Sequence, residues 1–439
     1  MKEVRLHYIY GKLIQQFISV GSLRIDINGF QSLHLKSKKT DIKTGQSVVI
    51  GLSNKKALRR MVFNPELAVG ELYMDGDLWV IDGSLEDFII LVFDNRQYWE
   101  QHILGKLYRF LQKILGIFST INRPKKSKQN VAHHYDLNDP LYDSFLDKWR
   151  QYSCAYFAES DKSPDKELNL EDAQEMKLAR LGAKLNLKPG LSILDIGCGW
   201  GGHAHALHLF EPDIKTTGIT LSENQLSYAQ NHLSFPLPPN LSQPRFQLID
   251  YRSMTNQFDR IISVGMLEHV GAQNFKTYFN KIASCLKPDG VAVIHTIASF
   301  GAPQLTNSWI TKYIFPGGYL PSLSELNRAI ESSGLVTTDI ELMRLHYAKT
   351  LQCWRQRFMA NQKEMIALFD ARFVRMWEFY LLGSEYYFRS GKGMVVQIQL
   401  AHDQEAVPLT REYIRDKTET YVKRLCQTQN SGKQPNSQR

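Results

Sequence analysis

An apolar stretch that ends in a carboxylate and a cluster of glycines is the part of the sequence best suited to chemistry. Residues 191–196 have the apolar character of a buried strand, and Asp195 lies near its end. The glycines that follow are Gly197, Gly199, Gly201 and Gly202. Residues 203–210 are then compatible with a helix. Glycines let the backbone approach a ligand closely, and a helix start offers free N–H groups. This order predicts a site for a nucleotide-type cofactor.

Two cofactors could bind such a turn. Segment 197–202 matches the G-x-G-x-x-G pattern of dinucleotide sites. That pattern also needs an acid near the end of the next strand, where segment 220–222 reads Thr-Leu-Ser. S-adenosylmethionine (SAM) has no pyrophosphate, but it carries an ammonium group that Asp195 could bind. The sequence therefore favours SAM over a dinucleotide, and over a strand–turn–helix corner without a ligand.

Predicted strands and helices alternate after this turn. The strands are expected at 215–220, 245–250, 258–265 and 291–297, with a helix at 273–286. Such alternation predicts an α/β fold with a doubly wound, mostly parallel sheet. Ligand groups belong at the carboxyl ends of its strands. The polar residues at or just beyond those ends are Asp195, Thr220, Asp250, Glu268 and His295. Their convergence indicates an enzyme.

Composition limits the class of protein. The 439 residues exceed one ordinary core and predict two domains. Five cysteines without a C-x-x-C pair indicate neither a disulfide framework nor a zinc knuckle. The first apolar stretch, 13–20, is too short and too polar for a signal peptide, and no run approaches the roughly 18 apolar residues of a membrane span. We therefore expect a cytoplasmic protein.

The net charge of +9 indicates a polyanionic partner. Residues 101–130 contain seven Lys or Arg and no acid, and apolar residues recur at helical spacing through the first half. This segment fits either a membrane-surface helix or a core-packed helix followed by a solvated linker. No zinc finger or RNA-binding motif supports a nucleic-acid partner.

The histidines do not predict a metal site. His133 and His134 are adjacent, so their side chains point apart, and of His203, His205 and His208 only the last two share a helix face. We expect the second group to form a partly exposed helix face.

Domain boundaries follow from composition shifts. Residues 1–120 resemble a small α+β accessory domain, in which a helix begins at 64–67 and is interrupted by Gly70 and Gly76. A basic, polar linker is expected at 121–130. The main domain then covers 131–426, and a polar, disordered tail covers 427–439.

Several blocks resemble the cyclopropane-fatty-acyl-phospholipid synthase family, whose SAM-dependent enzymes modify double bonds in lipid acyl chains. The blocks are 130–137, 152–154, 194–202, 218–225, 263–271, 295–297 and 315–318. The resemblance extends over about 130–402, and more loosely over 65–76. Blocks 152–154 and 263–271 are specific to the family, whereas most methyltransferases share the glycine turn.

The resemblance implies transfer of a methylene group from SAM to the cis double bond of an unsaturated phospholipid acyl chain, which forms a cyclopropane ring. The implied SAM contacts are Tyr135, Tyr152, Ser153, Asp195, Gly197, Cys198, Gly199, Trp200, Gly201, Gly202, Thr220, Leu221, Ser222, Gln225, Asp250, Tyr251 and Arg252. The implied ligands of a bicarbonate ion, acting as base, are Cys154, Glu268, His295, Tyr347 and the backbone of Ile297. Taken singly, Cys154, His295 and Tyr347 would also fit ordinary core positions.

The same resemblance gives the remaining segments a role. A lid with an acyl tunnel is expected at about 303–347, and the aromatic helix 369–388 should pack against the sheet. Many relatives have a cysteine where Ser384 stands, so a thiol nucleophile is excluded at that position. The implied partners are unsaturated phospholipids at the inner face of the membrane, with the first domain and 101–130 docking there, and a homo-oligomer is compatible with the sequence.

Three alternatives remain open at this point. A related methyltransferase would stop at a methyl or methylene branch, or methylate a small molecule. A lipid-surface binding protein would carry an inactive methyltransferase domain. A nicotinamide oxidoreductase would bind NADH instead of SAM.

Overall fold

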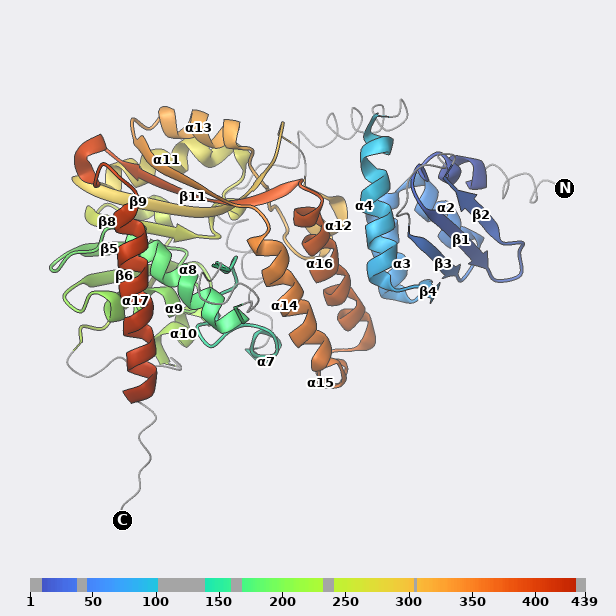
Figure 1. Cartoon of the computed structure of the whole chain (residues 1–439), viewed down its shortest axis with the longest axis horizontal. Helices are drawn as coiled ribbons and strands as arrows, with labels where there is room; N and C mark the ends of the chain where they lie inside the picture. The colour runs from blue at the N-terminus through green and yellow to red at the C-terminus, as the bar shows by residue number, and fades with distance from the viewer. Residues whose placement is uncertain are drawn as a thin grey trace, which may run out of the picture. The chain divides into compact units, whose positions relative to one another are not determined.

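The structure is a computed structural model that describes residues 10–37, 46–101, 139–158, 168–231, 241–303 and 306–431 (Figure 1). It divides into two compact units. The N-terminal unit comprises residues 1–119, 305–316 and 351–392, and the large unit comprises 120–304, 317–350 and 393–439. The basic segment from 102 onward, the predicted linker, Tyr135 and the His133–His134 pair lie outside the described residues.

The large unit is built on a seven-stranded sheet with strand order β10-β11-β9-β8-β5-β6-β7. Its strands are β5 (Ser192–Ile196), β6 (Lys215–Thr220), β7 (Arg245–Leu248), β8 (Phe258–Val264), β9 (Leu286–Ser299), β10 (Val336–Met343) and β11 (Gly393–Ala401). The five from β9 to β7 are parallel, and β11 and β10 add antiparallel partners at one edge. The predicted α/β fold with a mostly parallel sheet is confirmed.

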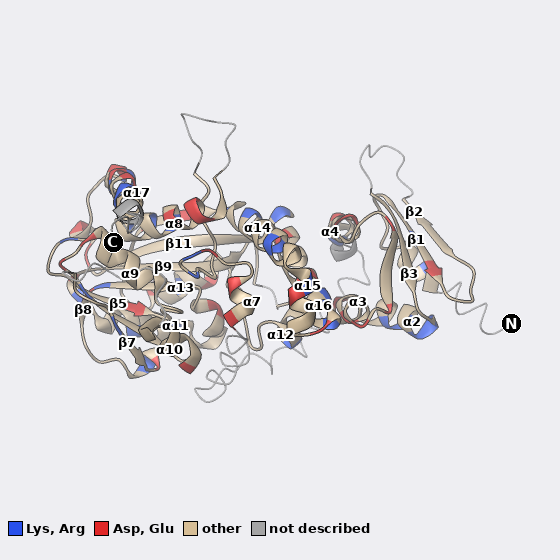
Figure 2. Cartoon of the chain, turned by 90° about the horizontal axis from the view of Figure 1, so that it is seen from below, with Lys and Arg blue, Asp and Glu red and all other residues tan. Residues whose placement is uncertain are grey.

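Helices cover both faces of this sheet because its central strands are apolar on both sides. Ile193 and Val293 pack with α8 (Leu170–Lys184), α9 (Gly202–Phe210) and α17 (Glu412–Ser431). Their neighbours Leu194 and Ile294 point to the other face, toward α11 (Phe275–Cys285) and α13 (Leu323–Glu331). Most Lys, Arg, Asp and Glu residues lie on the helices and loops (Figure 2).

Short elements complete the large unit. They are α7 (Asp139–Asp143), α10 (Glu223–Asn231) and the 3₁₀ turns Tyr251–Ser253, Leu267–His269, Ala272–Asn274 and Gln404–Ala406. Residues 287–290, between the predicted helix 273–286 and the predicted strand 291–297, already belong to β9. Helix α17 continues to Ser431, past the predicted start of the tail at 427. Tyr421 and Leu425 belong to the core cluster and hold this last helix against α8 and α9.

The N-terminal unit contains a four-stranded sheet of order β2-β1-β3-β4. Its strands are β1 (Ser22–Ile27), β2 (Leu33–Lys36), β3 (Ser47–Leu52) and β4 (Leu78–Asp82). Its helices are α2 (Lys55–Phe63), α3 (Pro65–Asp75), α4 (Leu85–Gln101), α12 (Ser308–Tyr313), α15 (Gln362–Leu368) and α16 (Ala371–Arg389). The unit boundary falls inside α14 (His346–Ala360), after Thr350.

Two segments predicted to belong to the main domain form part of the N-terminal unit. Glu71 on α3 is buried, and it accepts hydrogen bonds from Lys312 at 2.7 Å and Tyr313 at 2.8 Å. These bonds tie α12 to α3, so the expected lid at 303–347 is not one insertion. Its second part forms α13 and β10, which extend the large sheet.

The aromatic helix α16 also differs from its predicted place against the main sheet. It packs on α3 and α4, where the Tyr73 hydroxyl donates to Glu378 and the Tyr386 hydroxyl donates to Glu86, each at 2.8 Å. Both carboxylates are only partly buried, and these hydrogen bonds satisfy them where α16 packs on α3 and α4. In the described ranges, no helix is both long and apolar enough to cross a bilayer.

Gly70 was expected to interrupt α3, but the helix runs through it to Asp75. A Cβ at Gly70 would lie 2.5 Å from Nε1 of Trp309, whose side chain is buried. The glycine is therefore explained by close packing of α12 on α3, and Gly76, in the left-handed region with φ 77°, ends the helix.

Gly70→Ala is expected to lower the free energy of unfolding by about 1–3 kcal/mol relative to Gly383→Ala, because the added methyl must displace Trp309. Gly383 is the matched control, since it also lies inside a helix of the same unit and a Cβ there would meet nothing within 4 Å. Both variants gain similar helix propensity, so the difference between their free energies of unfolding in urea measures the cost of the collision with Trp309. Equal midpoints would contradict the packing role.

Candidate functional site

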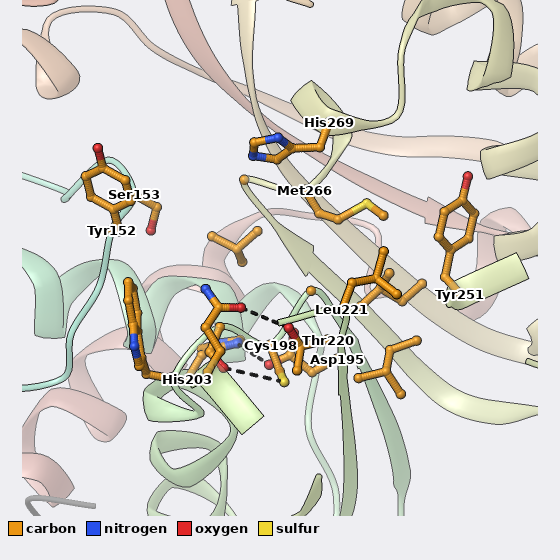
Figure 3. Close-up of a pocket in the computed structure, with 18 of the residues that line it drawn as sticks. Tyr152, Ser153, Asp195, Cys198, His203, Thr220, Leu221, Tyr251, Met266 and His269 are labelled. Carbon is orange, nitrogen blue, oxygen red and sulfur yellow. Dashed lines mark hydrogen bonds and ion pairs between the residues drawn. The ribbon is translucent and has the colours of Figure 1, made fainter. Parts of the chain in front are cut away.

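A pocket opens at the carboxyl ends of β5, β6 and β8, where the sheet topology predicts ligand binding (Figure 3). It brings together most of the residues that the sequence assigned to the cofactor. Those that line it are Tyr152, Ser153, Asp195, Gly197, Cys198, Gly199, Trp200, Thr220, Leu221, Gln225, Tyr251 and Arg252. Gly201, Gly202, Ser222 and Asp250 do not line it, and Tyr135 lies outside the described residues.

The first two glycines of the turn, Gly197 and Gly199, lie at the pocket. The last two, Gly201 and Gly202, pack against neighbouring residues. Gly197 and Gly199 have φ of 79° and 56°, which favours glycine, and a Cβ at Gly199 would point into open space. By contrast, a Cβ at Gly202 would lie 2.2 Å from the Trp149 carbonyl oxygen, and one at Gly201 would meet Phe246 at 2.8 Å. Packing therefore explains Gly201 and Gly202.

Asp195 has the environment expected for an ammonium-binding carboxylate. Its side chain is 2% exposed, yet its Oδ2 atom accepts no hydrogen bond. Nδ1 of His203 lies 3.9 Å away, which is beyond hydrogen-bond length. A buried carboxylate oxygen without a donor is costly. The ammonium group of SAM would supply that donor, so the residues present fit this cofactor.

The three helix histidines are buried, which corrects the expected partly exposed face. His203, His205 and His208 are at most 4% exposed, because His203 lines the pocket, His205 stacks on Phe246 of β7, and His208 is hydrogen-bonded to Ser242. Burial lowers the pKa of His205 and of His208 to about 4, so both are neutral near pH 7. Within the described part of the chain, no group of three potential ligands could hold a metal ion.

The ends of β6 and β7 are shaped by local hydrogen bonds. The Thr220 hydroxyl donates to the Gln225 side chain at 2.8 Å, and the Ser222 hydroxyl accepts the Gln225 backbone N–H, as a cap of α10. Asp250 accepts two bonds from the Arg252 guanidinium, at 2.8 and 2.6 Å. Ser222 and Asp250 thus orient Gln225 and Arg252, which reach the pocket.

The pocket also contains residues to which the sequence gave no role. They are Arg150, Gln151, His203, Met266 and His269, together with apolar neighbours. Burial lowers the pKa of His269 to about 4. Met266 and His269 lie in the recognised block 263–271, so that motif was the available signal, whereas nothing in the sequence distinguished Arg150 or Gln151.

Glu268 lies between Met266 and His269 and is buried beside β9. Its Oε1 accepts the backbone N–H of Ile297 at 2.6 Å, and its Oε2 has no hydrogen-bond partner. Burial raises the pKa of Glu268 to about 7. His295, two residues earlier on the same face of β9, is hydrogen-bonded through Nδ1 to Gln397, its register partner on β11, at 3.1 Å.

Cys154 and Tyr347 lie at a second junction, between segment 151–158 and the first turns of α14. Cys154 is fully buried, and burial raises the pKa of its thiol, so the group is not a thiolate near pH 7. The next backbone N–H, of Ala155, donates to Thr350 on α14 at 3.0 Å. Tyr347 is 8% exposed, one helical turn before Thr350.

Comparison with known proteins agrees with this architecture. A family model described as mycolic acid cyclopropane synthetase matches residues 122–398. The chain is 37% identical over 333 residues to the cyclopropane-fatty-acyl-phospholipid synthase of Escherichia coli K12, with 76% of this chain and 82% of that protein covered.

Solved structures with the same fold include two cyclopropane synthases. The cyclopropane synthase MmaA2 from Mycobacterium tuberculosis is 32% identical to this chain with a TM-score of 0.56. The match covers 62% of this chain and 98% of the MmaA2 chain. The mycolic acid cyclopropane synthase CmaA1, in complex with S-adenosylhomocysteine (SAH) and CTAB, is 33% identical with a TM-score of 0.56, and the match covers 62% of this chain and 97% of the CmaA1 chain. The chain thus belongs to the cyclopropane synthase family of SAM-dependent methyltransferases.

Proposed function

We propose that this enzyme converts the cis double bond of an unsaturated phospholipid acyl chain to a cyclopropane ring, with bound bicarbonate as the base. The observation that carries the proposal is the position of Glu268. Its neighbours Met266 and His269 line the cofactor pocket, while its carboxyl group is buried with one oxygen unpartnered. A buried acid–base group directly behind the pocket supports a reaction in which a proton must be removed.

SAM, when bound, supplies an electrophilic sulfonium methyl group. The protein's part is to hold the weakly nucleophilic alkene in line with that methyl and to exclude water. Asp195 and the turn with Gly197 and Gly199 would fix the amino-acid end of the cofactor, and Thr220 with Gln225 would meet its ribose. Aromatic faces can stabilise the cation that methyl transfer leaves on the lipid without trapping it.

Ring closure requires loss of a proton from the added methyl group. The proposed bicarbonate site consists of Glu268, His295, the Ile297 backbone, Cys154 and Tyr347. With a pKa of about 7, Glu268 can carry a proton near neutral pH and donate it as a hydrogen bond to a small anion. His295 is held by Gln397, which fixes its ring orientation.

The product is tested by incubating unsaturated phospholipid vesicles with the protein, SAM and bicarbonate, followed by mass spectrometry and proton NMR. We expect a gain of one CH₂, loss of olefinic protons and new upfield ring-methylene signals. The same gain with a methyl or exocyclic methylene signal would contradict ring formation. Unchanged lipids together with SAM binding would exclude phospholipid as the acceptor.

Glu268→Gln should remove turnover while it leaves SAH binding within about twofold, because Glu268 lies behind the pocket wall. It should also change how stability depends on pH. The pKa of Glu268 in the folded state, about 7, lies above the ordinary value of 4.5. Between these two pH values the folded state therefore binds more protons than the unfolded state. Wild-type stability should fall relative to Glu268→Gln from pH 4.5 to 7, by on the order of 3 kcal/mol.

Urea denaturation at several pH values measures this difference between Glu268→Gln and the wild type. Below pH 4.5 the contribution of a protonated Glu268 is fully present, and it is lost as the pH rises through 7. A difference that stays constant over this range would show that folding does not raise the pKa of Glu268.

We further propose that the basic segment 101–130 docks the enzyme on anionic membrane surfaces, because the acyl chain lies below the headgroups. Reversing the charge of Lys125, Lys126 and Lys128 to Glu should weaken sedimentation with anionic vesicles, most clearly at low salt. The control reverses the exposed lysines Lys188, Lys215 and Lys363, with the same change in net charge. Equal effects of the two triple variants would refute a specific docking segment.

A further inference from the structure

Lys177 on α8 is a buried lysine whose role no motif in the sequence indicates. Its side chain is fully buried, and its ammonium group donates hydrogen bonds to the side-chain oxygen of Gln151 and, at 3.0 Å, to the hydroxyl of Ser153. Gln151 and Ser153 both line the cofactor pocket, whereas Lys177 does not. Lys177 therefore reaches the pocket through these two side chains.

The charge of Lys177 has no direct counterion. Both of its hydrogen bonds end on neutral acceptors, and no described carboxylate forms an ion pair with it. The nearby Asp147 accepts the backbone N–H groups of Trp149 and Gln151 instead, at 2.8 and 2.9 Å. Burial lowers the pKa of Lys177 to about 8. A buried ammonium without an ion pair is costly, and an anionic ligand would offset part of that cost.

Lys184 shows what a structural lysine looks like on the same helix. It is equally buried, two turns further along α8, and its ammonium forms an ion pair with Glu341 at 2.6 Å. Lys184 thus has an ion-pair partner within the fold, whereas Lys177 interacts with the buried carboxylates of Asp147 and Asp195 only without direct contact.

Ser153 is oriented by its bond with Lys177. A hydroxyl has one hydrogen, and since the Ser153 oxygen accepts from Lys177, that hydrogen is available to another acceptor. Ser153 lies at the wall of the pocket next to Tyr152 (Figure 3). In the described part of the structure, the hydroxyl donates to no acceptor, so it can donate to an anionic oxygen inside the pocket.

We propose that Lys177 is a positioning residue for the carboxylate of SAM, which it binds through the Ser153 hydroxyl and whose charge it balances. The pocket then matches both charges of the cofactor's amino-acid end, because the Asp195 side chain offers its carboxylate to the ammonium group of SAM. Lys177 and Asp195 are close enough to interact electrostatically. The inference rests on cofactor binding alone and is independent of the lipid product.

The test compares two ligands by isothermal titration calorimetry with the full chain. SAH has the amino-acid end, and 5′-methylthioadenosine lacks it. Lys177→Met and Ser153→Ala should each weaken SAH binding, by about tenfold or more for the lysine, as expected for a charge-assisted hydrogen bond. Both variants should bind methylthioadenosine within about twofold of the wild type. The double variant should lose little more than Lys177→Met, because the two residues act in series.

Lys184→Met is the matched control, which should lower thermal stability without changing the ratio of the two affinities. A loss of affinity shared equally by both ligands would overturn the proposal, since Lys177 would then only maintain the fold. Unchanged SAH binding with an increased requirement for bicarbonate in turnover would also overturn it, because the charge would serve that anion instead. If Lys177→Met does not fold, Ser153→Ala decides by the same ratio.

Discussion

The site depends on buried polar groups that find no direct partner among the described residues. The carboxylate of Asp195 is held at the end of β5 with an oxygen that no described donor reaches. The glycine turn follows β5 directly, and the packing of Gly201 and Gly202 against Phe246 and Trp149 fixes this turn. A fold with such groups is pre-organised for a ligand, because the cost of desolvation has been met during folding.

The cofactor half of the molecule could be predicted from sequence because its signals are local. A strand that ends in Asp195, a glycine turn and a helix occupy consecutive residues, and the alternation of strands and helices specifies a parallel sheet. The family resemblance then implied Tyr152, Ser153, Thr220 and Tyr251 as cofactor contacts, and all four line the pocket.

What could not be predicted depends on contacts between distant residues. Lys177 looks like any lysine of an amphipathic helix, and only the fold shows that its ammonium meets Ser153. The partnership of Gln397 with His295 arises from strand register across 102 residues. The burial of His205 and His208 follows from contacts with Phe246 and Ser242, which come more than 30 positions later. The local sequence pattern carries no information on such contacts between distant residues.

The assembly of the N-terminal unit from three separate stretches has a consequence for biosynthesis. Its sheet leaves the ribosome early, but the helix that packs on α3 and α4 ends only at Arg389. Tyr73 and Glu86 lie on the faces of α3 and α4 that α16 covers. These faces therefore stay exposed until nearly 290 further residues have been synthesised. Vectorial folding, domain by domain, cannot complete this unit, so nascent chains have reason to engage a chaperone there.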